Sequence, residues 1–292
     1  MTLRKSLRAS IPDAIIYTVL IAAALAMLFP FVYVIAVSFT DPAVYVTGDV
    51  ILFPKQWSLD SYRYILSSNS FLYSFRSTVF ITIVGTVLNL AFSMTFAYAL
   101  TKKQLPGRGI MLSLVLFTFL FGAGLVPNFL LIRELGLLDS LWSLILPGLT
   151  NAWSIFVLKS FIQGLPESLE EAALIDGCNE LKVFYRIILP LSLPALAAFG
   201  LFFAVGQWNT YFSAVMYIQD ADKWPLQVLL QQLMVSQSAI GSAEVRETLE
   251  HTLPEETVKM AALVVVMVPI LAVYPFLQKY FAKGVLLGSV KG

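Results

Sequence analysis

Three carboxylates lie close together in a short polar segment of an otherwise apolar chain. Glu167, Glu170 and Glu171 directly follow Pro166, and Gly177 comes soon after them. Proline fits the first turn of a helix, and acidic side chains in that turn interact favourably with the helix dipole. Glycine adopts the left-handed conformation with which many helices end. The pattern therefore predicts a short helix between Pro166 and Gly177.

A second short helix is expected after Gly177, running into Leu189 and Pro190. Its apolar residues would share one side: Leu181, Phe184, Tyr185 and Ile188. Small residues in the first helix and at the bend would let another protein approach the backbone closely: Ala172, Ala173 and Gly177. Two short helices of this kind, too apolar for free solution, are typical of a docking element.

Other kinds of chemistry have little material in this chain. Cys178 and His251 are the only cysteine and histidine, which leaves nothing for a disulfide, a cysteine cluster or a histidine-based metal site. No Gly-x-x-x-x-Gly-Lys-Ser/Thr loop occurs, so we do not expect the chain itself to bind and cleave ATP in that manner. A net charge of +1 without a basic stripe argues against nucleic-acid binding.

The composition is that of a membrane protein, with 58% hydrophobic and 13% charged residues, against about 25% charged in soluble domains. Apolar segments long enough to cross about 30 Å of hydrocarbon cover residues 15–37, 72–100, 110–132, 141–161, 191–217 and 260–280. We therefore expect an all-α membrane protein with six transmembrane helices, residues 1–292 forming one domain. The first run is expected to be a retained helix, because it lacks a small-x-small cleavage site.

Lysine and arginine set the orientation, because they concentrate on the cytoplasmic side. With the N-terminus inside, the cytoplasmic face carries Arg4, Lys5, Arg8, Lys102, Lys103, Arg108, Lys159, Lys182, Arg186, Lys279, Lys283 and Lys291. Only seven of the 19 basic residues then lie outside or at outer span ends. Both termini and the docking segment, residues 165–190, are therefore expected in the cytoplasm of a plasma-membrane protein.

The fifth connection, residues 218–258, is long and acidic and is expected outside. Apolar residues repeat within it at helical spacing: Leu226, Leu229, Leu230, Leu233 and Met234. This spacing predicts an amphipathic helix lying on an apolar surface. Such a helix either covers the outer ends of the spans or forms a lid that contacts a ligand.

The docking segment resembles the coupling motif of binding-protein-dependent ABC importers. That motif is Glu-Ala-Ala, three residues, Gly, nine residues, then Ile-x-Leu-Pro. Every fixed position is filled here, by Glu171, Ala172, Ala173, Gly177, Ile187, Leu189 and Pro190, with Asp176 just before the glycine. Residues 57–62, 207–212 and 279–292 are similar to sugar-importer permeases of the maltose-system type. The long acidic connection resembles a Gram-positive branch that imports oligosaccharides, some derived from plant cell-wall polymers such as pectin.

This resemblance implies a type I importer permease that is not an enzyme by itself. Two separate ATPase subunits would carry ATP and Mg²⁺, and Glu171 would pair with a basic residue in an ATPase cleft. A homologous second permease would complete a heterodimer in which this chain is the smaller subunit. An extracellular solute-binding protein would deliver a sugar, and lipid would surround the spans. A non-sugar solute remains an alternative.

Polar residues within the expected spans are few. Arg76 lies near an outer end, where it either snorkels to the interface or faces a pathway. No Asp, Glu or His is placed to relay protons, which argues against an ion-coupled secondary transporter, and no Ser/His pair or paired carboxylate supports a membrane enzyme. The neutral candidates are Asn89, Asn151, Trp153, Trp208, Asn209 and Tyr211. They either contact sugar or serve interhelical hydrogen bonds and interfacial belts.

Overall fold

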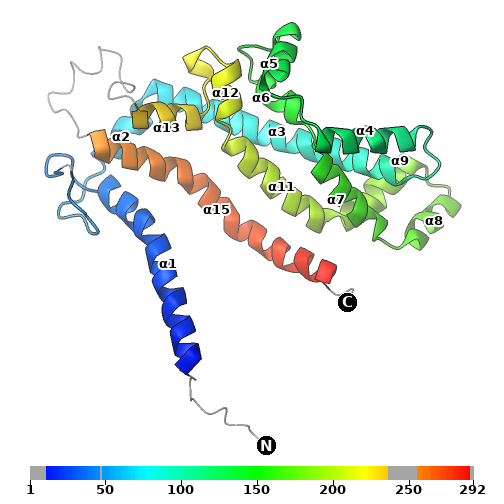
Figure 1. The fold of residues 1–292 in the computed structure, drawn as a ribbon, viewed down its shortest axis with the longest axis horizontal. Helices are drawn as coiled ribbons and strands as arrows, with labels where there is room; N and C mark the ends of the chain where they lie inside the picture. Colours follow the sequence, from blue (N-terminus) through cyan, green and yellow to red (C-terminus); the bar gives the residue numbers. More distant parts are fainter. Residues whose placement is uncertain (1–10, 47, 236–254, 290–292) are drawn as a thin grey trace, which may run out of the picture. The chain divides into compact units, whose positions relative to one another are not determined.

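The computed structural model describes residues 11–46, 48–235 and 255–289 (Figure 1). These residues are mainly helical and contain no strand, apart from one isolated bridge between Thr40 and Trp57. They group into two compact units, one of residues 11–68 and 255–267 and the other of residues 69–235 and 268–289. Residues 1–10, 236–254 and 290–292, including part of the acidic connection, lie outside the described residues.

The first unit is built on helix α1 (Ile11–Ser38), the N-terminal part of α15 (Glu255–Ser289) and the short α2 (Asp60–Ser67). The hydroxyl groups of Ser38 and Tyr62 are 2.7 Å apart, which ties the end of α1 to α2. Ser61 of α2 donates to the hydroxyl of Thr257 in α15 at 3.0 Å. The apolar side chains along most of α1 are exposed, as expected for a helix that lipid or a partner surrounds.

The second unit is organised around α3 (Asn69–Thr101), whose 33 residues correspond to about 50 Å of helix. Helices α7 (Ala152–Gln163) and α11 (Leu193–Trp208) both pack against α3. One apolar core near the C-terminal end of α3 includes Met94, Tyr98, Leu158 and Phe199. A second core forms around Ile81, Leu144, Tyr217 and Val228.

Three of the segments expected to be spans are not single helices. Residues 110–132 divide into α4 (Arg108–Leu120) and α5 (Leu125–Glu134), with Gly124 between them at a φ of 85°. Residues 141–161 divide into α6 (Trp142–Ile145), a 3₁₀ turn (Leu146–Gly148) and α7, bent by 51°. Residues 191–217 contain α11 and α12 (Phe212–Tyr217), broken at residues 209–211. Glycine and proline explain the first two breaks, because they weaken or remove i→i−4 hydrogen bonds.

The described residues include three helices that are long and apolar enough to cross a membrane, or up to five spans if each bent pair is one span. The three are residues 15–38 of α1, α3 and residues 256–273 of α15. The six-span count therefore stays a prediction.

The predicted amphipathic helix is confirmed as α13 (Leu226–Val235). Its buried residues are Leu226, Val228, Leu229, Leu230 and Leu233. The helix packs against α3, and its first N–H group, that of Leu226, donates to the hydroxyl of Thr78 at 2.8 Å. These contacts favour a helix that covers the N-terminal part of α3, where Thr78 lies.

Asp139 joins the loop before α6 to the loop between α12 and α13. It adopts a φ of 61°, and its Oδ1 accepts hydrogen bonds from the backbone N–H groups of Asp220 at 2.9 Å and Gln219 at 3.0 Å. Lys223 Nζ lies 3.7 Å from the other carboxylate oxygen. These interactions, led by the hydrogen bond from Asp220, hold the pKa of Asp139 below its ordinary value.

We expect Asp139→Ala to lower the thermal unfolding temperature more than Asp139→Asn. Asparagine tolerates a positive φ, and its amide oxygen can still accept the two backbone hydrogen bonds, whereas alanine does neither. Because the folded-state pKa is lowered, the carboxylate stabilises the fold above its ordinary pKa, and this contribution is lost as the pH falls through the folded-state value. The difference between wild type and Asp139→Asn should therefore shrink below pH 3.8. Melting curves across pH would check both points, and equal melting temperatures for the two variants would contradict the first.

Candidate functional site

The first half of the docking segment forms the predicted short helix, except that Pro166 takes the N-cap position and does not lie in the first turn. Helix α8 (Glu167–Ile175) begins directly after Pro166 and ends before Gly177, whose φ is 80°. The N–H of Gly177 donates to Leu174 O and that of Cys178 to Ala173 O, each at 3.0 Å. This pair of hydrogen bonds is the Schellman arrangement, which requires a residue in the left-handed region. The left-handed conformation predicted for Gly177 is therefore confirmed.

The second half is more irregular than expected. Asn179 caps α9 (Glu180–Val183) by accepting the N–H of Lys182 at 2.9 Å. A π-helical turn, η2 (Phe184–Ile188), then leads into α10 (Leu189–Leu191) and α11. The N–H of Leu189 donates to Phe184 O, five residues back. Pro190 lacks the N–H that an α-helical turn would direct to Arg186, so a wider turn costs little at this position.

The wide turn changes which side chains share a face. Phe184 and Ile188 are buried, whereas Leu181 and Tyr185 are exposed. The predicted single apolar side is therefore wrong, because spacing of three and four residues holds only within a regular α-helix. The buried residues join Val183, Ala173 and Tyr98 in the core near the end of α3.

The motif residues divide into an outward and an inward set. Glu171, Ala172, Asp176 and Gly177 are exposed, as is Pro190, while Ile187 and Leu189 are half-buried. Ala173 is buried within the chain's own core and so is not available for close contact with a partner. The apolar Ile175 beside this outward set is 86% exposed. The segment thus presents a mixed acidic and apolar surface on a base that is fixed to the rest of the unit.

A polar cluster that the sequence did not predict lies where α8 and α9 meet the C-terminal end of α3. Lys102, just after the end of α3, forms ion pairs with Glu170 of α8 and, at 2.7 Å, with Glu180 of α9. The Tyr98 hydroxyl donates to Glu180 Oε2 at 2.9 Å, and Glu170 Oε1 lies 3.3 Å from the same hydroxyl. The hydrogen bond from Lys102 holds the pKa of Glu180 below its ordinary value, and that from Tyr98 acts in the same direction. In the sequence, Lys102 appears only as a charge that contributes to orientation.

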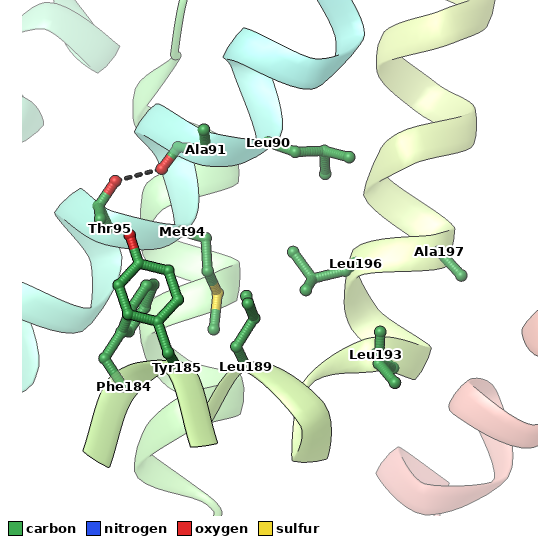
Figure 2. A pocket seen from close by; sticks show the side chains of 10 residues that line it. All are labelled: Leu90, Ala91, Met94, Thr95, Phe184, Tyr185, Leu189, Leu193, Leu196 and Ala197. Atoms are coloured by element: carbon green, nitrogen blue, oxygen red, sulfur yellow. Dashed lines mark hydrogen bonds between the residues drawn. The ribbon is translucent and has the colours of Figure 1, made fainter. Parts of the chain in front are cut away.

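A cavity of about 640 Å³ lies beside this segment, between α3 and residues 184–197 (Figure 2). Met94 and Thr95 contribute to it from α3, and Tyr185, Leu189 and Leu196 from the other side. Its lining is mainly apolar and contains no charged residue. The polar side chains among its lining residues are Thr95 and Tyr185, each of which carries a hydroxyl group.

The expected pathway residues are placed in several different environments. Asn151 caps α7 by accepting the N–H of Ser154 at 2.9 Å, which gives it a structural role. Asn89 is buried, and its Oδ1 accepts no hydrogen bond from any of the described residues. Trp153 packs on Phe199 and Phe202. None of these residues lines the cavity in Figure 2.

Trp208, Asn209 and Tyr211 gather at the C-terminal end of α11. Trp208 is buried and packs edge-on against Phe75, while Tyr211 is exposed. Asn209 donates to Val205 O at 2.9 Å and accepts a hydrogen bond from Gln227 of α13 at 3.1 Å. No group of three or more His, Cys, Asp or Glu that could hold a metal ion occurs within the described part of the chain.

The sequence of this chain is similar to those of known membrane transport proteins. The family model described as "Binding-protein-dependent transport system inner membrane component" matches residues 107–287. The polygalacturonan/rhamnogalacturonan transport system permease protein YtcP of Bacillus subtilis strain 168 is 48% identical over 280 residues, covering 96% of this chain and 98% of the relative.

Two solved structures extend the comparison. A chain from the crystal structure of a bacterial ABC transporter involved in the import of the acidic polysaccharide alginate is 34% identical. It has a TM-score of 0.87, with coverage of 96% of this chain and all of that chain. A chain from a bacterial alginate ABC transporter in complex with an alginate pentasaccharide-bound periplasmic protein shares the fold, with 15% identity, a TM-score of 0.54 and coverage of 91% and 93%.

These matches cover the docking segment and most of the rest of the chain, and they agree with its helical, membrane-type composition. The permease is not itself an enzyme, since ATP hydrolysis in ABC transporters is carried by other subunits. This chain therefore belongs to the family of inner-membrane components of binding-protein-dependent transport systems, and it is a permease subunit of an ABC importer with the type I fold.

Proposed function

We propose that this chain takes part in ATP-driven import of an acidic oligosaccharide, of the kind released from pectin. The 48% identical relative is named for polygalacturonan and rhamnogalacturonan transport, and the 34% identical chain belongs to an importer of alginate. All three polymers contain uronic acids. The likeness to both relatives extends over nearly the whole length of this chain, which supports a shared substrate class.

The other components follow from this proposal. A second permease completes the pore, an extracellular binding protein delivers the sugar, and two ATPase subunits bind ATP and Mg²⁺. Residues 1–292 act as one transmembrane domain with both termini in the cytoplasm, in keeping with the concentration of lysine and arginine there. Trp208, Asn209 and Tyr211 are the candidate sugar contacts, because aromatic rings and neutral amides suit a sugar's C–H faces and hydroxyls.

The observation that carries the ATP-driven part of the proposal is the outward surface formed by Glu171, Ala172, Ile175, Asp176 and Gly177. Glu171, whose carboxylate has no ion pair among the described residues, stands beside the exposed Ala172 and Ile175. An exposed apolar side chain next to an unpaired carboxylate fits a partner with an apolar cleft and a basic residue. We propose that this partner is an ATPase subunit.

Uptake by the complete transporter in proteoliposomes would test the proposal. With its binding protein present, labelled oligogalacturonide should enter only when ATP is available to the ATPases. Uptake that persists without ATP hydrolysis while an ion gradient is maintained would instead indicate a secondary transporter. Uptake of neutral arabino-oligosaccharide but not oligogalacturonide would overturn the substrate class while leaving ATP-driven import intact.

A further inference from the structure

Lys102 is the point at which both halves of the docking segment meet α3. Its ammonium group lies between Glu170 of α8 and Glu180 of α9, and 4.5 Å above the centre of the Tyr98 ring. Tyr98 adds its own hydrogen bond to Glu180 from within α3. One cation at the end of α3 therefore holds two carboxylates that come from separate helices.

The neighbouring Lys103 does not share this arrangement, although it carries the same charge. Its ammonium group is 4.0 Å from Glu167, and both side chains are 81% exposed. Lys102 and Glu170, in contrast, are 24% and 25% exposed, while Glu180 is 58% exposed, so the pair with Glu170 is the more buried of the two. Exposed pairs contribute little because water and salt screen them, whereas partly buried charge-assisted hydrogen bonds are stronger. The two adjacent lysines thus differ in environment while sharing the same charge.

The polar cluster around Lys102 lies directly next to the outward surface of α8. Glu170, which Lys102 holds, is the immediate neighbour of Glu171, which faces outward. Beneath them, Ala173, Val183 and Phe184 pack in the core with Tyr98, whose ring centre is 5.0 Å from that of Phe184. Apolar packing is non-directional and does not by itself select one position of α8 and α9 along α3, whereas the ion pairs with Lys102 join both helices to one point just after the C-terminal end of α3.

We propose that Lys102 is a positioning residue that transmits movement of the docking segment to α3. When an ATPase displaces α8, the ion pairs through Glu170 and Glu180 oblige the end of α3 to follow. Without Lys102, the apolar core still retains the segment and the ATPase still docks, but the displacement is partly lost as sliding. This inference rests on the proposed function, since it assigns a role within the same coupling site.

The test is Lys102→Met in the complete transporter, with Lys103→Met as the matched control. Methionine keeps the unbranched chain and removes the charge. The ATPase subunits should still co-purify and basal ATP hydrolysis should persist, while the amount of sugar transported per ATP hydrolysed should fall severalfold. Lys103→Met should leave this ratio unchanged, and Lys102→Arg should restore most of it.

Exchanging the charges of Lys102 and Glu180 tests whether the ion pairs themselves are needed or only a lysine side chain at position 102. In the double variant Lys102→Glu with Glu180→Lys, one cation again lies between two carboxylates, at positions 102 and 170. It should recover transport per ATP relative to Lys102→Glu alone.

An unchanged transport ratio in Lys102→Met would overturn the inference, and so would loss of ATPase co-purification in that variant, which would make Lys102 part of docking itself. Absence of ATP-dependent uptake in the wild type would instead overturn the proposed function.

Discussion

The Glu171→Lys variant is expected to lose sugar-stimulated ATP hydrolysis while remaining folded in the membrane. Glu171 is exposed on α8 and forms no ion pair within the described residues, so its replacement breaks no ion pair there. In the assembled transporter, a lysine there would face the basic residue that we propose in the ATPase cleft. Breaking a desolvated charge pair costs about 2–5 kcal/mol, or at least about 30-fold in affinity. Co-purification of the ATPases and stimulated hydrolysis would both be measured.

Glu167→Lys is the matched control for this prediction. It makes the same change of charge on the same helix, and within the described part of the chain the ion pair of Glu167 is the exposed one with Lys103, at 4.0 Å. We expect at most a small loss of stimulated hydrolysis in this variant, together with normal co-purification. Full stimulated activity in Glu171→Lys would refute the docking assignment, whatever the control does.

The Gly85→Leu variant is expected to disrupt the packing of α3 against α11. A Cβ atom at Gly85 would lie 2.8 Å from Cδ and 2.9 Å from Nε2 of Gln207, a buried residue of α11. Small residues allow helices in membranes to approach closely. Overpacking costs about 1–3 kcal/mol, so the thermal unfolding temperature should fall by several degrees and uptake should be lost.

Shortening Gln207 should partly restore Gly85→Leu. In the double variant Gly85→Leu with Gln207→Ala, the leucine can occupy the volume that the amide leaves, so the two effects should not add. Gly206→Leu serves as the control, because a Cβ there meets no atom within 4 Å. Additive effects of the two substitutions in melting experiments would show that the clash does not involve Gln207.

Local sequence signals predicted the elements that depend only on neighbouring residues. Pro166 and Gly177 bound α8 because proline and glycine restrict or permit particular backbone conformations. The leucine spacing in residues 226–235 predicted α13, because helical periodicity is local. The helical class of the whole protein likewise follows from its apolar runs.

Features that depend on distant residues could not be predicted in the same way. Tyr98 meets Glu170 and Glu180, which lie 72 and 82 residues further along the chain, only after α3 and the docking segment have packed. The burial of Ala173 also depends on that packing. The breaks near Gly124 and Pro147 did have a local signal, but the length of the apolar runs outweighed it in the prediction.

The number of residues between Gly177 and Ile187 determines how the side chains on either side of this interval are rotated relative to one another. Residues 180–191 run through α9, η2 and α10 without an intervening loop, and the chain then bends by 77° at Ser192 into α11. Adding or removing one residue in a helix turns everything beyond it by about 100°. Substitutions among the nine intervening residues preserve that phase. A single insertion or deletion there would change the orientation of Gly177 and α8 relative to Ile187, even if every motif residue were kept.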